Sequence, residues 1–253
     1  MNLIAESDWV VGVLLISVRL AALLLASPLF SLARLPARIS VLFVLVLAVL
    51  INDSLDQYSG LSVHGFGPLL KAACMELAVG ALLAFGVNCA FAAFSFGGRV
   101  LDLQMGFGVA NLVNPSTNEH APLMGTLLLV VGVMTFFLLN GHHWLVRGIL
   151  HSFQWLPLGA PLVSISLPAI LRQFGLMFSF GFIMVAPVVV VLLLMDVAMA
   201  IASRSMPQMN MFMLSMPLKI MMGFGVLALS APYMRNLLQR IFESIFTYWG
   251  GLV

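Results

Sequence analysis

Polar and ionisable side chains gather in one otherwise apolar stretch, Ser205–Gly225, which reads SMPQMNMFMLSMPLKIMMGFG. Because a lysine at the centre of a membrane helix costs about 2.5–3.5 kcal/mol on insertion scales, Lys219 is expected to pair with a carboxylate or a carbonyl. The acidic alternatives, which the sequence does not rank, are Asp102, Asp196 and Glu76. Prolines remove helix hydrogen bonds, and the freed backbone groups are tolerated at membrane depth only against protein or a water-filled cavity. We therefore predict a helix break formed by Pro207, Gln208, Asn210, Phe212, Pro217 and Lys219.

A second polar cluster lies in residues 97–122, GGRVLDLQMGFGVANLVNPSTNEHAP. Arg99 and Asp102 are three residues apart, so on a helix their charges can offset each other. Beyond Gln104 the chain becomes rich in glycine and then passes through Asn114-Pro115, a strong turn signal. The segment is either an ordinary exposed connection or a loop that enters or lines a conduit. The second interpretation is favoured by its apolar side chains, which are Phe107, Val109, Leu112 and Val113.

Motifs of enzyme chemistry are absent from the sequence: there is no HExxH, no GxSxG and no pair of carboxylates at catalytic spacing. The tripeptide Gly106-Phe107-Gly108 lacks the third glycine of a dinucleotide-binding loop and follows no strand. His142, His143 and His151 lie near Arg147 in an expected connection, where interfacial residues are favoured over a metal site. We therefore expect a protein without enzyme activity, cofactor or metal.

The composition indicates an integral membrane protein. Of 253 residues, 62% are hydrophobic and 8% are charged, whereas a soluble domain carries about 25% charged residues. A net charge of +2 without a basic run does not favour nucleic-acid binding. A signal peptide begins with basic residues, whereas the first residues of this chain include Glu6 and Asp8. The first apolar segment is therefore expected to stay in the mature protein. No repeat or linker is visible, and we expect residues 1–253 to form a single domain.

Six apolar segments can be drawn: Val10–Leu29, Ile39–Ile51, Leu69–Phe96, Leu123–Asn140, Phe174–Met195 and Leu218–Tyr233. A membrane span needs about 20 residues, so the second segment is too short to cross and the third is longer than needed. Six crossings also leave Arg235 and Arg240 on the wrong side of the membrane for the positive-inside rule. Either one segment does not cross, or some helices form hairpins buried against protein. We favour the second, and predict an all-α membrane protein of long, bent or interrupted helical hairpins.

At the two polar clusters the chain resembles the FliR family of flagellar biosynthetic proteins, whose injectisome relatives share the pattern. The motifs are DLQMGFGVANLVNP at Asp102–Pro115 and PQMNMFMLSMPLK at Pro207–Lys219, and residues 34–38, RLPAR, are similar to the family's basic turn. The resemblance covers the whole length in order and spacing, and the PQxNxFxxxxPxK pattern is specific. The family often has Asp before the proline of the first motif. Here Asn114 occupies that position, so a charge there is not essential or is supplied elsewhere.

The resemblance implies a subunit of the type III protein export gate in the bacterial inner membrane, within the flagellar basal body. FliR-like proteins assemble with FliP-like and FliQ-like subunits and contact an FlhB-like switch protein. The helical assembly forms the membrane entrance pore for unfolded flagellar substrates. The helix-break residues would then shape subunit contacts, with Arg99, Asp102 and Gln104 near the pore plug. The plug would be the loop that contains Gly106, Phe107, Val109, Leu112, Val113, Asn114 and Pro115.

Two other functions remain as alternatives. An injectisome export gate would share the same motifs. A secondary transporter also uses discontinuous helices with polar residues at the membrane midplane. Many transporters have two related halves, and no such internal symmetry is visible in this sequence.

Overall fold

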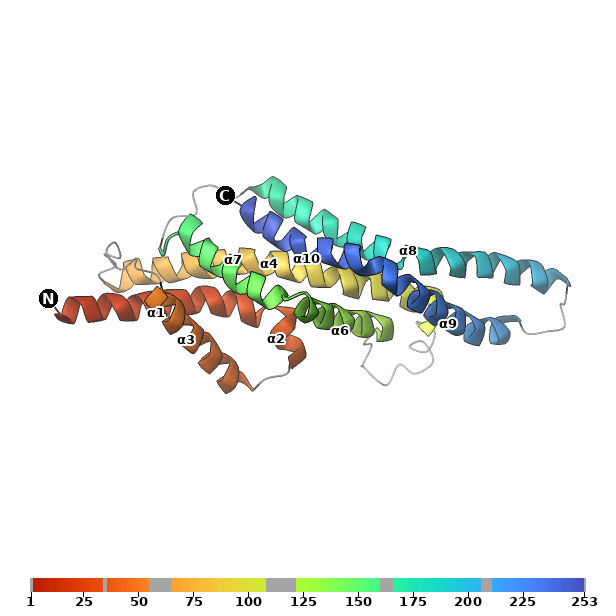
Figure 1. The fold of residues 1–253 in the computed structure, drawn as a ribbon, viewed down its shortest axis with the longest axis horizontal. Coiled ribbons are helices and arrows are strands. Elements are labelled where there is room, and N and C mark those ends of the chain that lie inside the picture. The colour runs from red at the N-terminus through yellow and green to blue at the C-terminus, as the bar shows by residue number, and fades with distance from the viewer. Residues whose placement is uncertain are drawn as a thin grey trace. The chain divides into compact units, whose positions relative to one another are not determined.

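The structure is a computed structural model that describes residues 2–33, 36–54, 65–107, 122–159, 166–205 and 211–252, without the side chains of 2–8, 33, 211 and 212. The described residues form helices and no strand (Figure 1), which confirms the predicted all-α class. The helices are α1 (Asn2–Leu25), α2 (Pro28–Ala33), α3 (Ala37–Ser54), α4 (Phe66–Met105), α6 (Leu123–Leu138), α7 (Gly141–Trp155), α8 (Leu167–Ser205), α9 (Met211–Ser230), the 3-10 helix η2 (Ala231–Met234) and α10 (Arg235–Gly250).

Four helical stretches of the described chain are long and apolar enough to cross a membrane: α3, α4, α8 and Met213–Gly250. The interrupted pair α6 and α7 adds a fifth if the two helices count as one span. The prediction that the second apolar segment is too short to cross is wrong, because α3 extends it at both ends to 18 residues. Helices α4 and α8 have 40 and 39 residues, so each is about 60 Å long, twice the hydrocarbon thickness.

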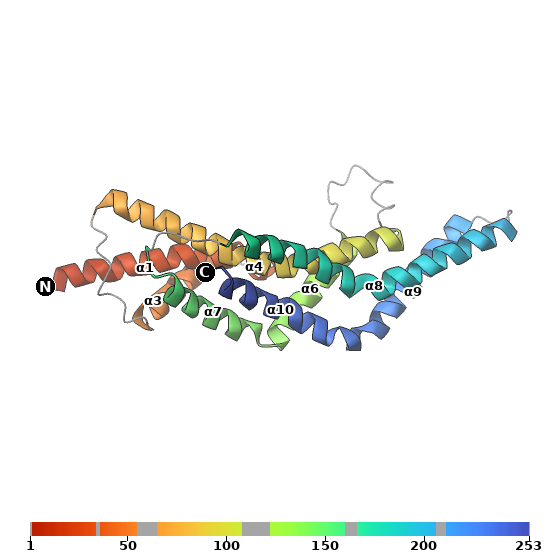
Figure 2. The same ribbon diagram turned by 90° about the horizontal axis from the view of Figure 1, so that it is seen from above.

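The chain folds as two compact units, and α4, α8 and α10 contribute residues to both. The first unit contains Met1–Cys89, Asn140–Gln173 and Ser244–Val253. In it α1 packs against α3 (Figures 1 and 2), where the Trp9 indole donates to Asp53 Oδ1 at 3.2 Å. The prediction of a single domain stays a prediction.

Glycines and a tryptophan allow the helices of the first unit to pack closely. A Cβ placed on Gly80 of α4 would lie 2.5 Å from the carbonyl oxygen of Arg19 on α1, so only glycine allows this helix contact. On α10 the Trp249 indole donates to Leu83 O at 3.1 Å, and a Cβ on Gly148 of α7 would lie 2.4 Å from its ring. Trp249 therefore holds α7 and α4 at fixed distances.

The second unit contains Ala90–Leu139 and Phe174–Glu243. Four fully buried phenylalanines form its core, with ring centroids between 5.2 and 6.4 Å apart: Phe91, Phe94, Phe136 and Phe242. The Phe94–Phe242 rings are stacked and the other cited pairs are tilted or edge-to-face, and such contacts add about 0.5–1.5 kcal/mol per pair to the gain from burial.

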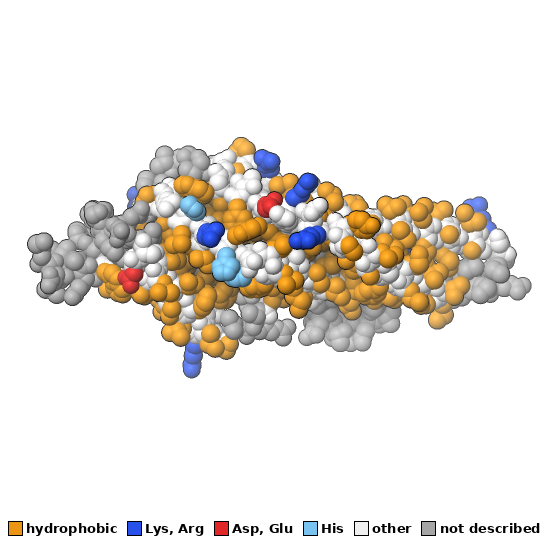
Figure 3. Space-filling model, viewed as in Figure 1, with side chains coloured by type: hydrophobic (Ala, Val, Ile, Leu, Met, Phe, Trp, Pro, Cys, Tyr) orange, Lys and Arg blue, Asp and Glu red, His pale blue; other side chains and the backbone are white. Residues whose placement is uncertain are grey.

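Much of the described surface remains apolar, and hydrophobic side chains dominate the face drawn in Figure 3. Only 28% of the apolar window in α8 is buried, and only 6% of that in Met213–Gly250. Soluble monomers rarely expose apolar patches beyond a few hundred Å². These helices must therefore meet lipid or other protein chains.

Candidate functional site

Asp102 on α4 anchors the start of α6. Its buried carboxylate accepts a hydrogen bond from the Met124 N–H at 2.9 Å and another from the Gly125 N–H at 3.3 Å. The first N–H groups of a helix lack intrahelical partners and attract negative charge. Pro122, at the N-cap position of α6, gives no side-chain hydrogen bond to them. Asp102 therefore supplies the cap from a different helix.

Arg99 and Asp102 both lie on α4, but they do not form an ion pair. Arg99 is exposed on α4, and neither of the two ion pairs found in the described part of the chain includes it. The two residues are three positions apart on α4, as the sequence indicated. The buried Asp102 carboxylate faces the unpaired N–H groups of α6, whereas Arg99 is exposed. Gln104, the third residue of this predicted cluster, is half-buried and is the second-last residue of α4.

Glycines allow α4 and α6 to touch at this anchor. A Cβ placed on Gly98 would lie 2.4 Å from Gly125 Cα and 2.5 Å from Gly125 N. Both distances are shorter than a Cβ atom can tolerate. Gly98 therefore permits the backbone contact that brings the Gly125 N–H within reach of Asp102.

Gly106 ends α4 in the left-handed conformation, with φ of +83°. Glycine is the usual residue for such a helix end because it carries no Cβ. Gly106 and Phe107 begin the predicted plug loop, and both are described. The remaining predicted plug residues, which lie outside the described part of the chain, are Val109, Leu112, Val113, Asn114 and Pro115.

The segment of the predicted helix break lies between the end of α8 at Ser205 and the start of α9 at Met211. The described part of the chain does not include Pro207, Gln208, Asn210 or the side chain of Phe212. Pro217 lies inside α9, which continues through it without interruption.

Lys219 on α9 pairs with Asp196 on α8, with Nζ and Oδ1 2.5 Å apart. Of the three acidic partners that the sequence left open, the structure pairs Lys219 with Asp196. Asp102 instead caps α6, and Glu76 pairs with Arg19. The Lys219 side chain is 20% exposed and that of Asp196 38%, so this pair lies at the surface of the second unit. It connects α8 and α9, the helices before and after residues 206–210, which lie outside the described part of the chain.

Replacing Lys219 with Met is expected to lower the free energy of unfolding by about 0.5–1 kcal/mol, because a partly exposed ion pair contributes little in water. The charge exchange Lys219→Asp with Asp196→Lys should recover most of this loss. Unfolding of the full chain in gentle detergent measures the change. Lys71→Met is the matched control, since Lys71 is exposed and has no ion pair among the described residues. An equal loss in this control would contradict a specific pair.

A buried ion pair that sequence reasoning missed lies in the first unit. Arg19 on α1 and Glu76 on α4 are each 1% exposed, and Nε and Oε2 are 2.5 Å apart. The Arg19 guanidinium also donates to Ser152 O and Oγ, both at 3.2 Å, and to Leu156 O at 2.9 Å. It stacks over the Phe153 ring, 4.2 Å from the centroid.

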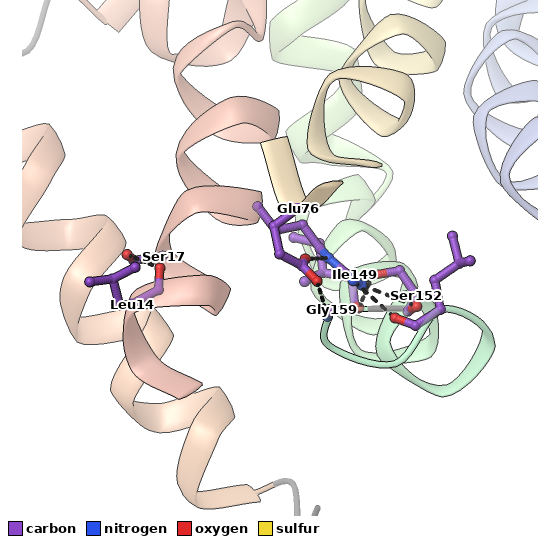
Figure 4. A network of polar contacts seen from close by, with 8 residues as sticks. Leu14, Ser17, Glu76, Ile149, Ser152 and Gly159 are labelled. Carbon is purple, nitrogen blue, oxygen red and sulfur yellow. Dashed lines mark hydrogen bonds and ion pairs between the residues drawn. The ribbon is translucent and has the colours of Figure 1, made fainter. Parts of the chain in front are cut away.

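The second carboxylate oxygen of Glu76 accepts the Gly159 N–H at 2.9 Å, and Figure 4 shows Glu76 turned toward Ser152 and Gly159. These contacts form a buried clamp, defined here as Arg19, Glu76, Ser152, Leu156 and Gly159. It joins α1, α4, the end of α7 and the turn after it. The sequence did contain a signal for this ion pair, because Arg19 and Glu76 each lie within an apolar segment, where an ionisable residue is expensive unless it is paired.

The described residues contain no group of three or more His, Cys, Asp or Glu side chains placed to hold a metal ion. The three polar clusters described above are the Asp102 helix anchor, the Lys219–Asp196 ion pair at the surface and the buried clamp. Each of them positions helices.

Comparison with known proteins gives a consistent family. A family model described as bacterial export proteins, family 1, matches residues 10–245. The chain is 31% identical to flagellar biosynthetic protein FliR of Bacillus subtilis (strain 168) over 234 residues, which cover 91% of this chain and 90% of that protein. It is 27% identical to FliR of Escherichia coli (strain K12), with 93% and 90% covered. Yop proteins translocation protein T of Yersinia pestis is 26% identical over 57% of this chain and 56% of its own length.

The family model extends over nearly the whole chain, and the FliR relatives match it over nine-tenths of their lengths. These matches include both polar clusters and confirm the resemblance drawn from their motifs. The chain therefore belongs to the bacterial export proteins, family 1.

Proposed function

We propose that this chain is a non-enzymatic subunit of the flagellar type III protein export gate in the bacterial inner membrane. The observation that carries the proposal is the similarity to FliR of Bacillus subtilis along 91% of the chain. The injectisome alternative has support from the Yersinia translocation protein, but that match covers only 57% of the chain. The flagellar role is therefore favoured, and the secondary transporter has no comparable support.

In this function the chain assembles with FliP-like and FliQ-like subunits, contacts an FlhB-like switch protein, and lines the entrance pore for unfolded flagellar substrates. The exposed apolar faces of α8 and of Met213–Gly250 are available for contact with such subunits or with lipid. The break between α8 and α9, linked by the Lys219–Asp196 pair, would set the shape of the surface offered to these subunits.

The loop from Gly106 to Pro122 serves as the pore plug in this proposal. Its two ends are anchored to the same stretch of α4, which supports that role. The chain leaves α4 at Gly106, whose left-handed conformation ends the helix, and returns at α6, whose first N–H groups bind Asp102. Asp102 therefore holds the two helix ends that carry the loop beside each other.

Affinity purification of the tagged chain from a gentle detergent, followed by mass measurement of the intact complex, tests the assembly. A complex containing FliP-like and FliQ-like subunits is expected. A lone 27.4 kDa species under native conditions would contradict the proposal. So would solute uptake by the chain alone in liposomes. Restored swimming in a strain lacking its own FliR, without restored injectisome secretion, would separate the flagellar role from the alternative.

Deleting part of Val109–Asn118 is expected to let ions pass through the assembled complex without abolishing assembly. Apolar side chains at a constriction close a pore by excluding water, and the deletion removes them. Conductance of the purified complex in planar bilayers measures the leak, and its intact mass shows that assembly persists. Unchanged conductance with normal assembly would contradict the plug assignment.

A further inference from the structure

Helix α7 carries a polar stripe on a protein whose described surface is mostly apolar. The stripe consists of the exposed side chains of His143, Arg147, His151 and Gln154. All described histidines lie in α7, so the pale-blue side chains of Figure 3 belong to this helix. The first three residues recur every four positions and span about 12 Å along one face. The opposite face is buried and contains Leu145, Ile149, Ser152 and Phe153.

The stripe is held facing outward by contacts on the buried side of α7. The Arg19 guanidinium binds the carbonyls of Ser152 and Leu156 at the C-terminal end of the helix. Near the middle of the helix, Gly148 is pressed against the ring of Trp249. Two separate contacts therefore oppose rotation of α7, and its polar side chains cannot turn into the unit.

The composition of the exposed face indicates the environment it meets. The sequence of α7 contains no carboxylate, and the ion pairs formed by the described residues do not include Arg147. Val146 and Trp155 are 41% and 47% exposed, and the Trp155 ring stacks on His151 with centroids 6.0 Å apart. Basic, tryptophan and aliphatic side chains together on one short helix are typical of the boundary between lipid headgroups and acyl chains.

The length of α7 agrees with this position. With 15 residues it is about 22 Å long, shorter than the hydrocarbon core of a bilayer. It begins after Asn140, whose φ of 57° separates it from α6. The sequence of α6 carries no charged residue, whereas the polar stripe begins within one turn of the break.

We propose that α7 lies in the headgroup region of the membrane and that Arg147, flanked by His143 and His151, binds the phosphate of an anionic phospholipid. A guanidinium offers five N–H donors in a planar fork that matches phosphate oxygens. The His143 imidazole supplies a further donor on one side, whereas the Nδ1 atom of His151 bonds to Gln154 Oε1 at 2.9 Å. An acidic segment of a partner protein would satisfy Arg147 but would leave Val146 and Trp155 without an apolar environment. The inference does not depend on the proposed export role.

Lipid binding to the purified full chain tests the proposal. Native mass measurement during titration with phosphatidylglycerol or phosphatidylcholine is expected to show preference for the anionic lipid. Arg147→Gln should reduce this preference about fivefold, which corresponds to about 1 kcal/mol for one basic side chain at an anionic surface. Arg147→Lys should retain most of it. The control Arg99→Gln removes an exposed arginine from α4 and should change it little.

A second measurement locates the lipid. In vesicles, brominated phosphatidylglycerol should quench the fluorescence of Trp155, taken as the difference from Trp155→Phe, more strongly than brominated phosphatidylcholine. Equal quenching by both lipids, or equal losses for Arg147→Gln and Arg99→Gln, would overturn the proposal. If Arg147→Gln leaves the lipid preference unchanged but weakens co-purification of partner subunits, the stripe binds protein and the lipid assignment is wrong.

Discussion

Replacing Glu76 with Ala is expected to lower the free energy of unfolding by about 3–5 kcal/mol, because it leaves a buried guanidinium without its counter-charge. The Gly159 N–H loses its acceptor in the same variant. Glu76→Gln keeps a carbonyl acceptor but not the charge, so an intermediate loss is expected. Thermal or denaturant-induced unfolding of the full chain in gentle detergent measures the free energy of unfolding of each variant.

The double variant Arg19→Met with Glu76→Met separates charge from packing. Exchanging a buried ion pair for apolar side chains of similar volume is often neutral, so this variant should be more stable than Glu76→Ala. Arg38→Gln, an exposed arginine on α3, is the control. If Glu76→Ala lost no more stability than this control, the buried clamp would not stabilise the first unit.

Replacing Gly98 with Ala is expected to lower the free energy of unfolding by about 2–4 kcal/mol. The new Cβ would meet the backbone of Gly125, which cannot yield as the end of a flexible side chain can. Overpacking costs about 1–3 kcal/mol, and each buried hydrogen-bonding group left without a partner adds about 1–3 kcal/mol. The hydrogen bonds of Asp102 to the start of α6 would be strained or lost.

Gly225→Ala is the matched control, because apart from the neighbouring backbone of its own helix no described atom lies within 4 Å of a Cβ at that position. Alanine favours a helix over glycine, so this variant should be neutral or more stable by up to about 1 kcal/mol. Similar stabilities for the two variants would show that α4 and α6 do not touch at Gly98. The same unfolding assay measures both.

The amino-acid sequence by itself determined the class of this protein. Its shortage of charge and its long apolar segments predict a membrane protein made of helices, because hydropathy and helix-forming preference act over neighbouring residues. The motif at Pro207–Lys219 also identified the family, which the comparisons confirm. The same local logic predicted that Lys219 pairs with a carboxylate or a carbonyl, since an unpaired ammonium at membrane depth is expensive whatever the fold.

Only the tertiary structure decided which groups meet. Arg19 and Glu76 are 57 residues apart in the chain, and no local pattern relates them. Local spacing allowed Arg99 to offset the charge of Asp102, but the buried Asp102 carboxylate binds the first N–H groups of α6 instead. The extent of α3 and the contact at Gly98 likewise depend on packing. Polar groups in an apolar interior take the partners that the packed helices bring to them, and hydropathy does not encode that choice.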